Sequence, residues 1–246
     1  MAAEQRVALV TGSALNIGRA IAQGLAEDGF RVMVTARNSH DDVGRTADLI
    51  RQAGGQAATH MADISDPAQA RGLIDATIAA FGRLDVLVNN ASVRKQTNIH
   101  EITPEEWREV MGATLDSAFY CAQAAAKHIA ASGGGSIVNL GGMSAHVGAT
   151  GRVHASTAKA AIVGLSRVLA TELAGDNITV NTVVPGSIDT VRGAAAGARP
   201  PHMPGNLAGR MGRPEEIAGM VRYLCGPAAR YVTGQTLHVN GGAFLT

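Results

Sequence analysis

Hydrophobic and polar positions follow two rhythms along the chain, and their alternation predicts the fold. Short apolar runs rich in β-branched residues predict buried strands, and longer runs with apolar residues three and four positions apart predict amphipathic helices. The predicted strands lie at 6–12, 30–36, 56–63, 84–90, 135–141, 178–186 and 234–240. The predicted helices lie at 41–53, 67–81, 104–131 and 151–174, with one more between the first strand and Gly29 and another after Pro214.

The strands are apolar at almost every position, which indicates burial on both faces. Such strands alternating with helices are typical of a parallel sheet that is covered by helices on each side. We therefore predict one doubly wound α/β domain over residues 1–246, with a parallel sheet of about seven strands. One segment departs from this rhythm: residues 187–213 are rich in Gly, Pro and Ala, and we expect them to form a loop that acts as a substrate lid.

Composition excludes several classes of function. The chain has 246 residues, is 46% hydrophobic and carries a net charge of +1 with basic and acidic residues interspersed, so no basic surface for nucleic acid is expected. Its two cysteines, Cys121 and Cys225, fit neither a disulfide nor a metal spacing, which favours a reducing compartment and no metal. No signal peptide or membrane span is expected, and we predict a cytoplasmic protein.

The stretch VTGSALNIGRAIA lies where the first strand passes into the first helix. Its glycines permit a tight turn, and the free N–H groups and positive dipole of a helix N-terminus attract a pyrophosphate. Asn16 stands at the centre of the turn, and asparagine tolerates a positive φ better than other non-glycine residues. Its amide is a further candidate donor to a phosphate oxygen. The alternative is an ordinary strand–helix turn that happens to contain two glycines.

Several motifs together resemble those of the short-chain dehydrogenase/reductase family, and of its 3-oxoacyl-acyl-carrier-protein reductase-like members in particular. The motifs are Thr11-Gly12-x-x-x-Asn16-Ile17-Gly18, ADIS at 62–65, NNAS at 89–92, VPGSIDT at 184–190 and the C-terminal segment that begins GRPEEIAGM. The resemblance covers essentially the whole chain. It implies a Rossmann fold, an oxidoreductase acting on a carbonyl or alcohol, and a homotetramer or dimer built on the helices at 104–131 and 151–174.

The end of the second strand bears on the choice of dinucleotide. An acidic residue there would bind the ribose 2′-hydroxyl of NAD(H), but this chain has Ala36 followed by Arg37, whose guanidinium suits a 2′-phosphate. NADP(H) is therefore favoured over NAD(H), although Leu15 supplies no second cation and Arg37 is open to interpretation as a solvated charge. The resemblance implies cofactor contacts from Gly12, Ser13, Asn16, Ile17, Gly18, Arg37, Asp63, Ile64, Asn90, Ala91, Ser92, Lys159, Pro185, Gly186, Ile188 and Thr190.

The family's catalytic positions are altered. Its members use a Tyr-x-x-x-Lys pair, a serine and an asparagine, and only the lysine is kept here, as Lys159. The tyrosine position is Ala155, the serine position Gly142 and the asparagine position Thr114. Loss of one general acid removes about 10²–10⁴ in rate, so the usual proton transfer is not available.

Polar residues near these positions are candidate replacements. Ser144 and His146 follow the fifth strand and are candidate catalytic groups, because a histidine titrates near neutral pH. Arg94, Arg152 and His154 are candidate substrate-binding residues, the two arginines suiting a carboxylate or phosphate; as alternatives, the arginines are solvated charges and the histidines structural.

Three hypotheses follow from these observations. The favoured one is an NADP(H)-dependent oxidoreductase with a non-standard catalytic site. The second is a catalytically silent dinucleotide-binding protein that acts as a sensor or as the partner of an active subunit. The third is a non-redox enzyme, such as a dehydratase or isomerase, that uses the same pocket.

Overall fold

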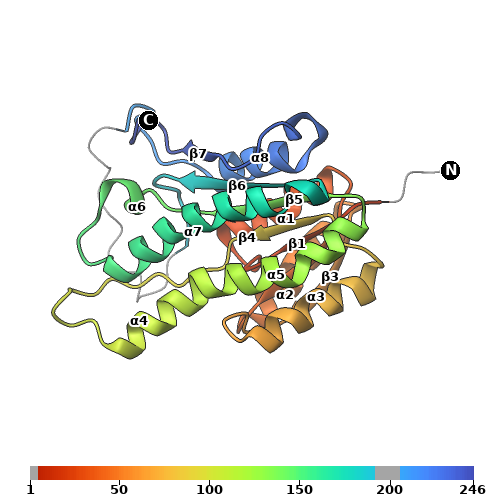
Figure 1. The fold of residues 1–246 in the computed structure, drawn as a ribbon, viewed down its shortest axis with the longest axis horizontal. Coiled ribbons are helices and arrows are strands. Elements are labelled where there is room, and N and C mark those ends of the chain that lie inside the picture. The colour runs from red at the N-terminus through yellow and green to blue at the C-terminus, as the bar shows by residue number, and fades with distance from the viewer. Residues whose placement is uncertain (1–4, 192–205) are drawn as a thin grey trace.

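A computed structural model of the chain describes residues 5–191 and 206–246 as a seven-stranded parallel sheet with helices on both faces (Figure 1). The strand order is β3-β2-β1-β4-β5-β6-β7. The strands are β1 (Val7–Val10), β2 (Arg31–Ala36), β3 (Gln56–Met61), β4 (Val86–Asn89), β5 (Gly135–Leu140), β6 (Ile178–Pro185) and β7 (Thr236–Val239). The predicted doubly wound Rossmann domain is confirmed.

Helices cover the sheet in two layers, each with its own apolar core. One core packs α1 (Asn16–Glu27), α2 (His40–Gln52) and α8 (Pro214–Cys225) on the sheet, and the other packs α3 (Pro67–Phe81) and α5 (Ser117–Ala131) together with α7 (Val153–Glu172). Figure 1 shows α5 and α7 crossing the near face. The strand residues alternate between the two cores, which explains why the strands are apolar at nearly every position.

The helices differ from the sequence prediction at two places. The helix predicted at 104–131 consists of α4 (Pro104–Met111) and α5, joined by a π-helical turn, η1 (Gly112–Asp116). A short helix, α6 (Ser144–Val147), precedes α7 and was not predicted. Within residues 5–191 and 206–246 the other short helices are η2 (Ala174–Asp176) and η4 (Pro227–Ala229). A π turn inside a helix is frequent at functional sites, and this one contains Thr114.

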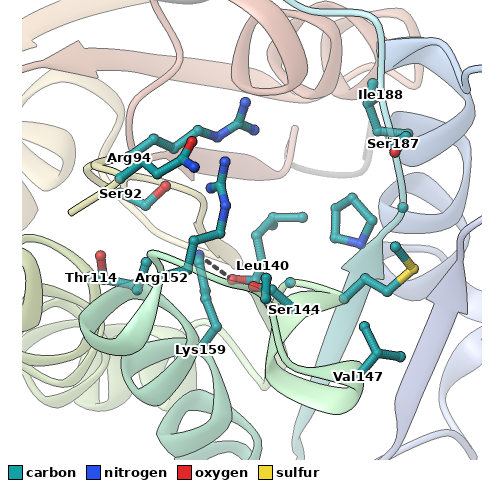
Figure 2. A pocket seen from close by; sticks show the side chains of 18 of the residues that line it. Ser92, Arg94, Thr114, Leu140, Ser144, Val147, Arg152, Lys159, Ser187 and Ile188 are labelled. Atoms are coloured by element: carbon teal, nitrogen blue, oxygen red, sulfur yellow. Dashed lines mark hydrogen bonds between the residues drawn. The ribbon is translucent and has the colours of Figure 1, made fainter. Parts of the chain in front are cut away.

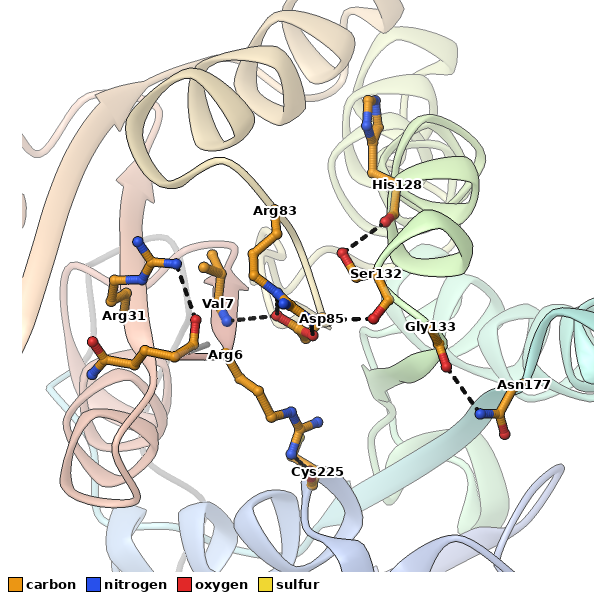
Figure 3. A network of polar contacts seen from close by, with 11 residues as sticks. Arg6, Val7, Arg31, Arg83, Asp85, His128, Ser132, Gly133, Asn177 and Cys225 are labelled. Carbon is orange, nitrogen blue, oxygen red and sulfur yellow. Dashed lines mark hydrogen bonds and ion pairs between the residues drawn. The ribbon is translucent and has the colours of Figure 1, made fainter. Parts of the chain in front are cut away.

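The amino ends of the strands are held by a buried polar network (Figure 3). The carboxylate of Asp85, 2% exposed, accepts hydrogen bonds from the backbone N–H of Val7 at 2.8 Å and from Arg83 at 2.7 and 3.0 Å. Arg83 also donates to the backbone oxygen of Ser132 at 3.1 Å. This edge is therefore closed by structural contacts, and the opposite, carboxyl edge carries the loops that are free to form a site.

Of the predicted lid at 187–213, residues 192–205 lie outside the described residues. The two described flanks contact each other: the N–H of Asp189 donates to the oxygen of Gly212 at 2.8 Å, and the N–H of Gly212 donates to the oxygen of Ser187 at 2.9 Å. The base of the segment is thus a closed loop that begins and ends beside the carboxyl ends of the strands.

Candidate functional site

Two adjoining cavities open at the carboxyl edge of the sheet. The smaller, about 480 Å³, is lined by the turn after β1, the end of β2 and residues 62–65. The larger, about 1200 Å³, is lined by the loops after β4, β5 and β6 and by the start of α7. Ile17, Asn90, Ser92, Val93 and Arg94 line both cavities. The boundary falls where the sheet order reverses between β1 and β4, the place where ligands bind in open α/β sheets.

The turn after β1 has the tight geometry that the glycines predicted. Gly12 has φ +63°, and a side chain there would lie 2.9 Å from Cα of Ala91. A Cβ at Gly18 would lie 2.2 Å from the oxygen of Gly12, so only glycine fits. Leu15, at the N-cap of α1, has no side-chain acceptor for the first amides of the helix. The helix N-terminus is therefore left open to an anion, which fits the pyrophosphate of a dinucleotide.

Asn16 adopts a positive φ of 53°, as expected for asparagine in this turn. Its amide, however, is bound to the backbone of Val191: Nδ2 donates to the oxygen at 3.0 Å, and Oδ1 accepts from the N–H at 2.9 Å. Both polar atoms of the amide thus hold the segment after β6, and donation to a phosphate oxygen stays a prediction, because Nδ2 has a second N–H. Asn16 still lines the smaller cavity.

The far end of the smaller cavity holds Arg37 and Asp63. The Arg37 side chain is 43% exposed, and its guanidinium lies 3.7 Å from the Asp63 carboxylate. The Ser65 hydroxyl, which donates to Asp63 at 2.6 Å, is the main cause of a lowered Asp63 pKa, and Arg37 adds to it. Arg37 is thus placed to contact a ligand phosphate in this cavity, with no acidic side chain at the end of β2.

Most of the predicted cofactor residues gather at the two cavities. The smaller is lined by Gly12, Asn16, Ile17, Gly18, Arg37, Asp63, Ile64, Asn90, Ala91 and Ser92, and the larger by Lys159, Pro185, Gly186 and Ile188. Two of the predicted cofactor residues lie outside both cavities. Ser13 is fully buried, with its hydroxyl donating to the oxygen of Val10 at 2.7 Å, and Thr190 is buried, with its hydroxyl 3.4 Å from Arg94; neither lines a cavity.

Lys159 and the three altered positions share the larger cavity, as the resemblance implied (Figure 2). Nζ of Lys159 donates to the backbone oxygen of Leu140, at the end of β5, at 2.5 Å. Burial lowers the pKa of Lys159 to about 7, and the positive charge of Arg94 contributes to the shift. Thr114 is buried, and its hydroxyl has no hydrogen-bond partner within the described part of the chain.

The two histidines proposed from the sequence do not line either cavity. The His146 ring packs against His238, with 4.6 Å between centroids, and against Phe244 at 5.6 Å, so it faces β7 and the C-terminal segment. His154 is fully buried, and its Nε2 lies 2.9 Å from Oε1 of Glu106 on α4. Both rings thus fill contacts between elements rather than the pocket, and the roles expected of His146 and His154 stay predictions.

Ser144, Arg94 and Arg152 do line the larger cavity, and Figure 2 shows both arginines extending over it from separate loops. Asn206 and Met211 line it too, and both lie within the segment 187–213 that was predicted as a substrate lid. Gln96 and Asn98 also line it and were missed by the sequence analysis. No motif marks these two positions, and their one signal is that they lie in the loop after β4.

Two further classes of site are absent from residues 5–191 and 206–246. No three or more His, Cys, Asp or Glu side chains are arranged to hold a metal ion there. None of the helices in these ranges is long and apolar enough to cross a membrane. Both cysteines are free and buried, and burial raises the pKa of each thiol to about 12.

Comparison with known proteins finds relatives along the whole chain. A family model described as enoyl-(acyl carrier protein) reductase matches residues 12–243. An uncharacterized oxidoreductase of Methylorubrum extorquens is 40% identical over 245 residues, covering 97% of this chain and 98% of that protein. The 3-oxoacyl-(acyl-carrier-protein) reductase FabG of Escherichia coli is 35% identical over 244 residues, 98% of each chain.

Solved structures agree with these sequence matches. The acetoin dehydrogenase of Enterobacter cloacae is 36% identical and superposes with a TM-score of 0.90, covering 98% of this chain and 96% of that one. A short-chain dehydrogenase/reductase of Serratia marcescens is 34% identical with a TM-score of 0.88, covering 97% of each chain.

Proposed function

Since the chain belongs to the short-chain dehydrogenase/reductase family, we propose that it is an oxidoreductase that transfers hydride between NADP(H) and a carbonyl or alcohol substrate. The observation that carries this proposal is the pair of adjoining cavities. One has the open helix N-terminus and the Arg37 cation that suit a phosphorylated dinucleotide, and the other is large enough for a small organic substrate. Both meet at Asn90, Ser92 and Arg94.

The dinucleotide, when bound, supplies the hydride chemistry. The chain's own residues bind and orient it. The backbone of the turn at Gly12 and Gly18 receives the pyrophosphate, and Asp63 and Ile64 flank the adenine end. Arg37 receives the 2′-phosphate, which makes NADP(H) the preferred form, because Ala36 offers no carboxylate to the 2′-hydroxyl of NAD(H).

The substrate cavity has a strongly cationic lining. Arg94, Arg152 and Lys159 line it, and no aspartate or glutamate does among the described residues. A guanidinium binds a carboxylate or phosphate through two parallel hydrogen bonds. The substrate is therefore a carbonyl or alcohol compound that also carries an anionic group, with Arg152 and Arg94 as its ligands. The apolar side chains of Met143, Val147 and Ile188 exclude water beside it.

Ser144 is the proposed orienting group for the substrate oxygen. Its hydroxyl stands at the start of α6 and lines the larger cavity two residues after Gly142, where the family's serine is missing. A hydroxyl donor there would stabilise the negative charge that develops on the carbonyl oxygen during hydride transfer. Ser144 is preferred to His146, the other candidate, because the His146 ring packs against His238 and Phe244 and does not line the cavity.

The second candidate function is a silent dinucleotide-binding protein. It is favoured by the altered positions, since Ala155 and Gly142 carry no acidic group.

A fluorescence titration with NADPH and NADH tests the binding step shared by both functions. Hydride transfer is then assayed with acetoacetate, methyl acetoacetate and diacetyl. NADPH binding with turnover of acetoacetate supports the oxidoreductase, and NADPH binding with no turnover of any of the three supports the silent protein. No binding of either dinucleotide contradicts both.

The proposed assembly is a homo-oligomer, a dimer or tetramer, built on α4–α5 and α7. Apolar side chains are exposed on these helices: Phe119 is 41% exposed, Val153 37% and Val168 55%. Exposed apolar residues gathered on neighbouring helices are typical of a face that pairs with another copy. Light scattering after size-exclusion chromatography tests this, and a monomer at micromolar concentration would contradict it.

A further inference from the structure

We propose that Lys159 is itself the proton donor of this site, protonating the substrate oxygen in place of the missing tyrosine. The inference rests on the proposed oxidoreductase function and assigns Lys159 a role beyond binding the cofactor. Three observations support it: the position of the ammonium group, the small residues Gly142 and Ala155 beside it, and the chemistry of the other groups that line the same cavity.

The ammonium group lies at the cavity wall. Lys159 lies on α7, and its Nζ is held by the backbone oxygen of Leu140, itself a lining residue (Figure 2). A lysine ammonium has three N–H donors, so this contact fixes its position and leaves two donors for other partners. The same contact points Nζ at the end of β5, beside the loop that carries Gly142.

The side chains that would cover the ammonium are absent. A Cβ at Gly142 would lie 3.4 Å from Cγ of Lys159 and 3.7 Å from its Cβ, so any residue with a side chain there would stand against the lysine stem. Ala155 lies four residues before Lys159 on α7, on the same helix face, and ends at its methyl group. Gly142, Ala155 and Lys159 all line the larger cavity, so no polar side chain at these two positions stands beside the lysine.

The other groups that line the cavity are poor proton donors. Arg94 and Arg152 have guanidinium groups that stay protonated at all ordinary pH values. The hydroxyl groups that line the cavity ionise far above neutral pH, and they belong to Ser92, Thr114, Ser144, Thr150 and Ser187. Among the described lining residues, Lys159 is therefore the group that can release a proton near neutral pH.

The charged groups on neighbouring elements leave this property intact. On α4, Glu106 is bound to Thr97 and His154, and Glu109 to Lys95. These carboxylates do not line the cavity, and neither does Asp116 of η1.

No titratable group of α6 lines the cavity either, because His146 faces His238. Burial and the cation of Arg94 thus act on Lys159 unopposed and lower its pKa to about 7, the range in which a general acid is most effective.

When a ketone is reduced, the carbon–oxygen π bond breaks, the carbonyl carbon gains the hydride with oxidation of the dinucleotide, and the oxygen gains a proton from Nζ. Lys159 is left as a neutral amine and regains a proton from solvent. In the direction of alcohol oxidation, the neutral amine accepts the hydroxyl proton.

Competitive acetylation of the apo protein tests the acidity of Lys159 without any turnover. The chain has three lysines, Lys95, Lys127 and Lys159, so peptide mass spectrometry resolves each one. The protein is treated briefly with acetic anhydride from pH 5.5 to 11, and the midpoint of reactivity is read for each lysine. We expect a Lys159 midpoint near 7, as its lowered pKa implies.

A Lys159 midpoint near 10.4, the value of an ordinary lysine, would overturn the proposal. So would a Lys159 that is not acetylated at any pH, because the cavity would then not reach it. Neither result depends on finding a substrate, so the test stands apart from the proposed function.

Two substitutions test the role in hydride transfer. Lys159→Arg keeps a positive charge and cannot release a proton at neutral pH, whereas Lys159→Met removes both properties. We expect Lys159→Arg to keep NADPH binding by fluorescence titration but to lose about 10²–10⁴ in the rate of acetoacetate reduction. Lys127→Arg, on the exposed face of α5, is the matched control and should keep both.

A Lys159→Arg protein that reduces acetoacetate at the rate of the unchanged protein would overturn the proposal. In the unchanged protein the rate of reduction should also fall as the pH rises through about 7, because the donor is then deprotonated. A rate that stays constant from pH 6 to 9 would contradict it.

Discussion

The carboxamide of Asn16 and the backbone of Val191 form a reciprocal pair of hydrogen bonds, 3.0 Å for Nδ2 to the oxygen and 2.9 Å for the N–H to Oδ1. Asn16 lies in the turn after β1, and Val191 follows β6, so the pair joins two segments that line the smaller cavity. Glycine fits a positive φ without strain and would be the simpler residue there. Asparagine is less favourable than glycine at this φ, but its carboxamide binds the segment after β6, which glycine could not do.

Replacing Asn16 with glycine should free Val191 while leaving the turn intact. Losing a hydrogen bond worth about 0.5–1.5 kcal/mol predicts amide exchange of Val191 about two- to tenfold faster. Hydrogen exchange measured on the peptide that contains Val191 checks this. Asn177→Gly is the control, because Asn177 also has a positive φ, of 58°, but lies before β6 at the other edge of the sheet. Unchanged exchange in Asn16→Gly would contradict the prediction.

Arg37→Ala should weaken NADPH binding selectively. A hydrogen bond to a charged group contributes about 1.5–3 kcal/mol, and half-exposure of the Arg37 side chain, at 43%, reduces this, so we expect a Kd about tenfold higher. The Kd for NADH should not change, since NADH has no 2′-phosphate. Both values come from fluorescence titration. Arg51→Ala, on α2 and outside both cavities, is the matched control. Equal weakening of both dinucleotides would mean that Arg37 does not read the 2′-phosphate.

Arg152→Gln should remove the preference for an anionic substrate. Acetoacetate and methyl acetoacetate differ in the carboxylate, so the ratio of their kcat/KM values reports its recognition. We expect the unchanged protein to favour acetoacetate by at least about tenfold and Arg152→Gln to bring the ratio close to one. Arg152 is substituted rather than Arg94 because Arg94 also lines the smaller cavity, so its loss would affect both cavities. Arg108→Gln, exposed on α4, serves as the control. An equal loss for both probes would contradict the prediction.

Lys159→Met should stabilise the protein most at low pH. The folded-state pKa of Lys159 is about 7, below its ordinary value of 10.5, so between these values the unfolded chain binds more protons than the folded one. Stability of the unchanged protein therefore rises with pH across that window, and the full penalty of the buried charge acts below pH 7.

We expect the stability gained by Lys159→Met to be largest at pH 6 and to shrink toward pH 10. Urea unfolding at pH 6, 8 and 9.5 measures it, and Lys127→Met controls for the loss of a lysine. A gain that is equal at all three values would show that Lys159 is not buried as a charge.

Glu106→Gln should destabilise the folded protein at neutral pH but less so in acid. The Thr97 hydroxyl, and then His154, lower the pKa of Glu106 below its ordinary value of 4.5. The carboxylate therefore contributes stability above pH 4.5, and this contribution is lost as the pH falls through the lower folded-state pKa.

Thermal unfolding at pH 7, 5 and 3.5 checks this expectation. NADPH binding at pH 7 should be unchanged, because neither Glu106 nor His154 lines a cavity. Glu105→Gln is the control, since Glu105 lies beside it on the exposed face of α4 and pairs with Arg108 at 3.6 Å. A gap between the Glu106→Gln and unchanged proteins that stays constant down to pH 3.5 would contradict the prediction.

The sequence by itself determined the fold, because the signals for its elements are local. The helix predicted at 67–81 matches α3 at both ends, since Pro67 occupies the first turn, Asp66 caps it and Gly82 ends it with φ +80°. The motif residues that follow β1, β4 and β6 also meet as predicted, because parallel strands bring their carboxyl ends to one edge of the sheet.

Only the tertiary structure decided which way the polar side chains of the site point. His146 and His154 lie near the altered catalytic positions in the sequence, but each ring contacts residues that are remote in the chain. His146 packs against His238 and Phe244, and His154 binds Glu106. The π turn at 112–116 was equally hidden, because a slightly wider turn does not change the spacing of apolar residues enough to mark it.

Lys159 shows the same division between the two levels. The sequence was enough to place Lys159 on a helix and to match it to the lysine of the family's Tyr-x-x-x-Lys pair. The acidity of its ammonium, however, depends on burial, on the cation of Arg94 and on the space left by Gly142 and Ala155. Burial and electrostatic coupling depend on distances between segments that are far apart along the chain. A pattern of residue types specifies which segments form helices and strands. Packing then determines how deeply each ionisable group is buried and which charges lie near it.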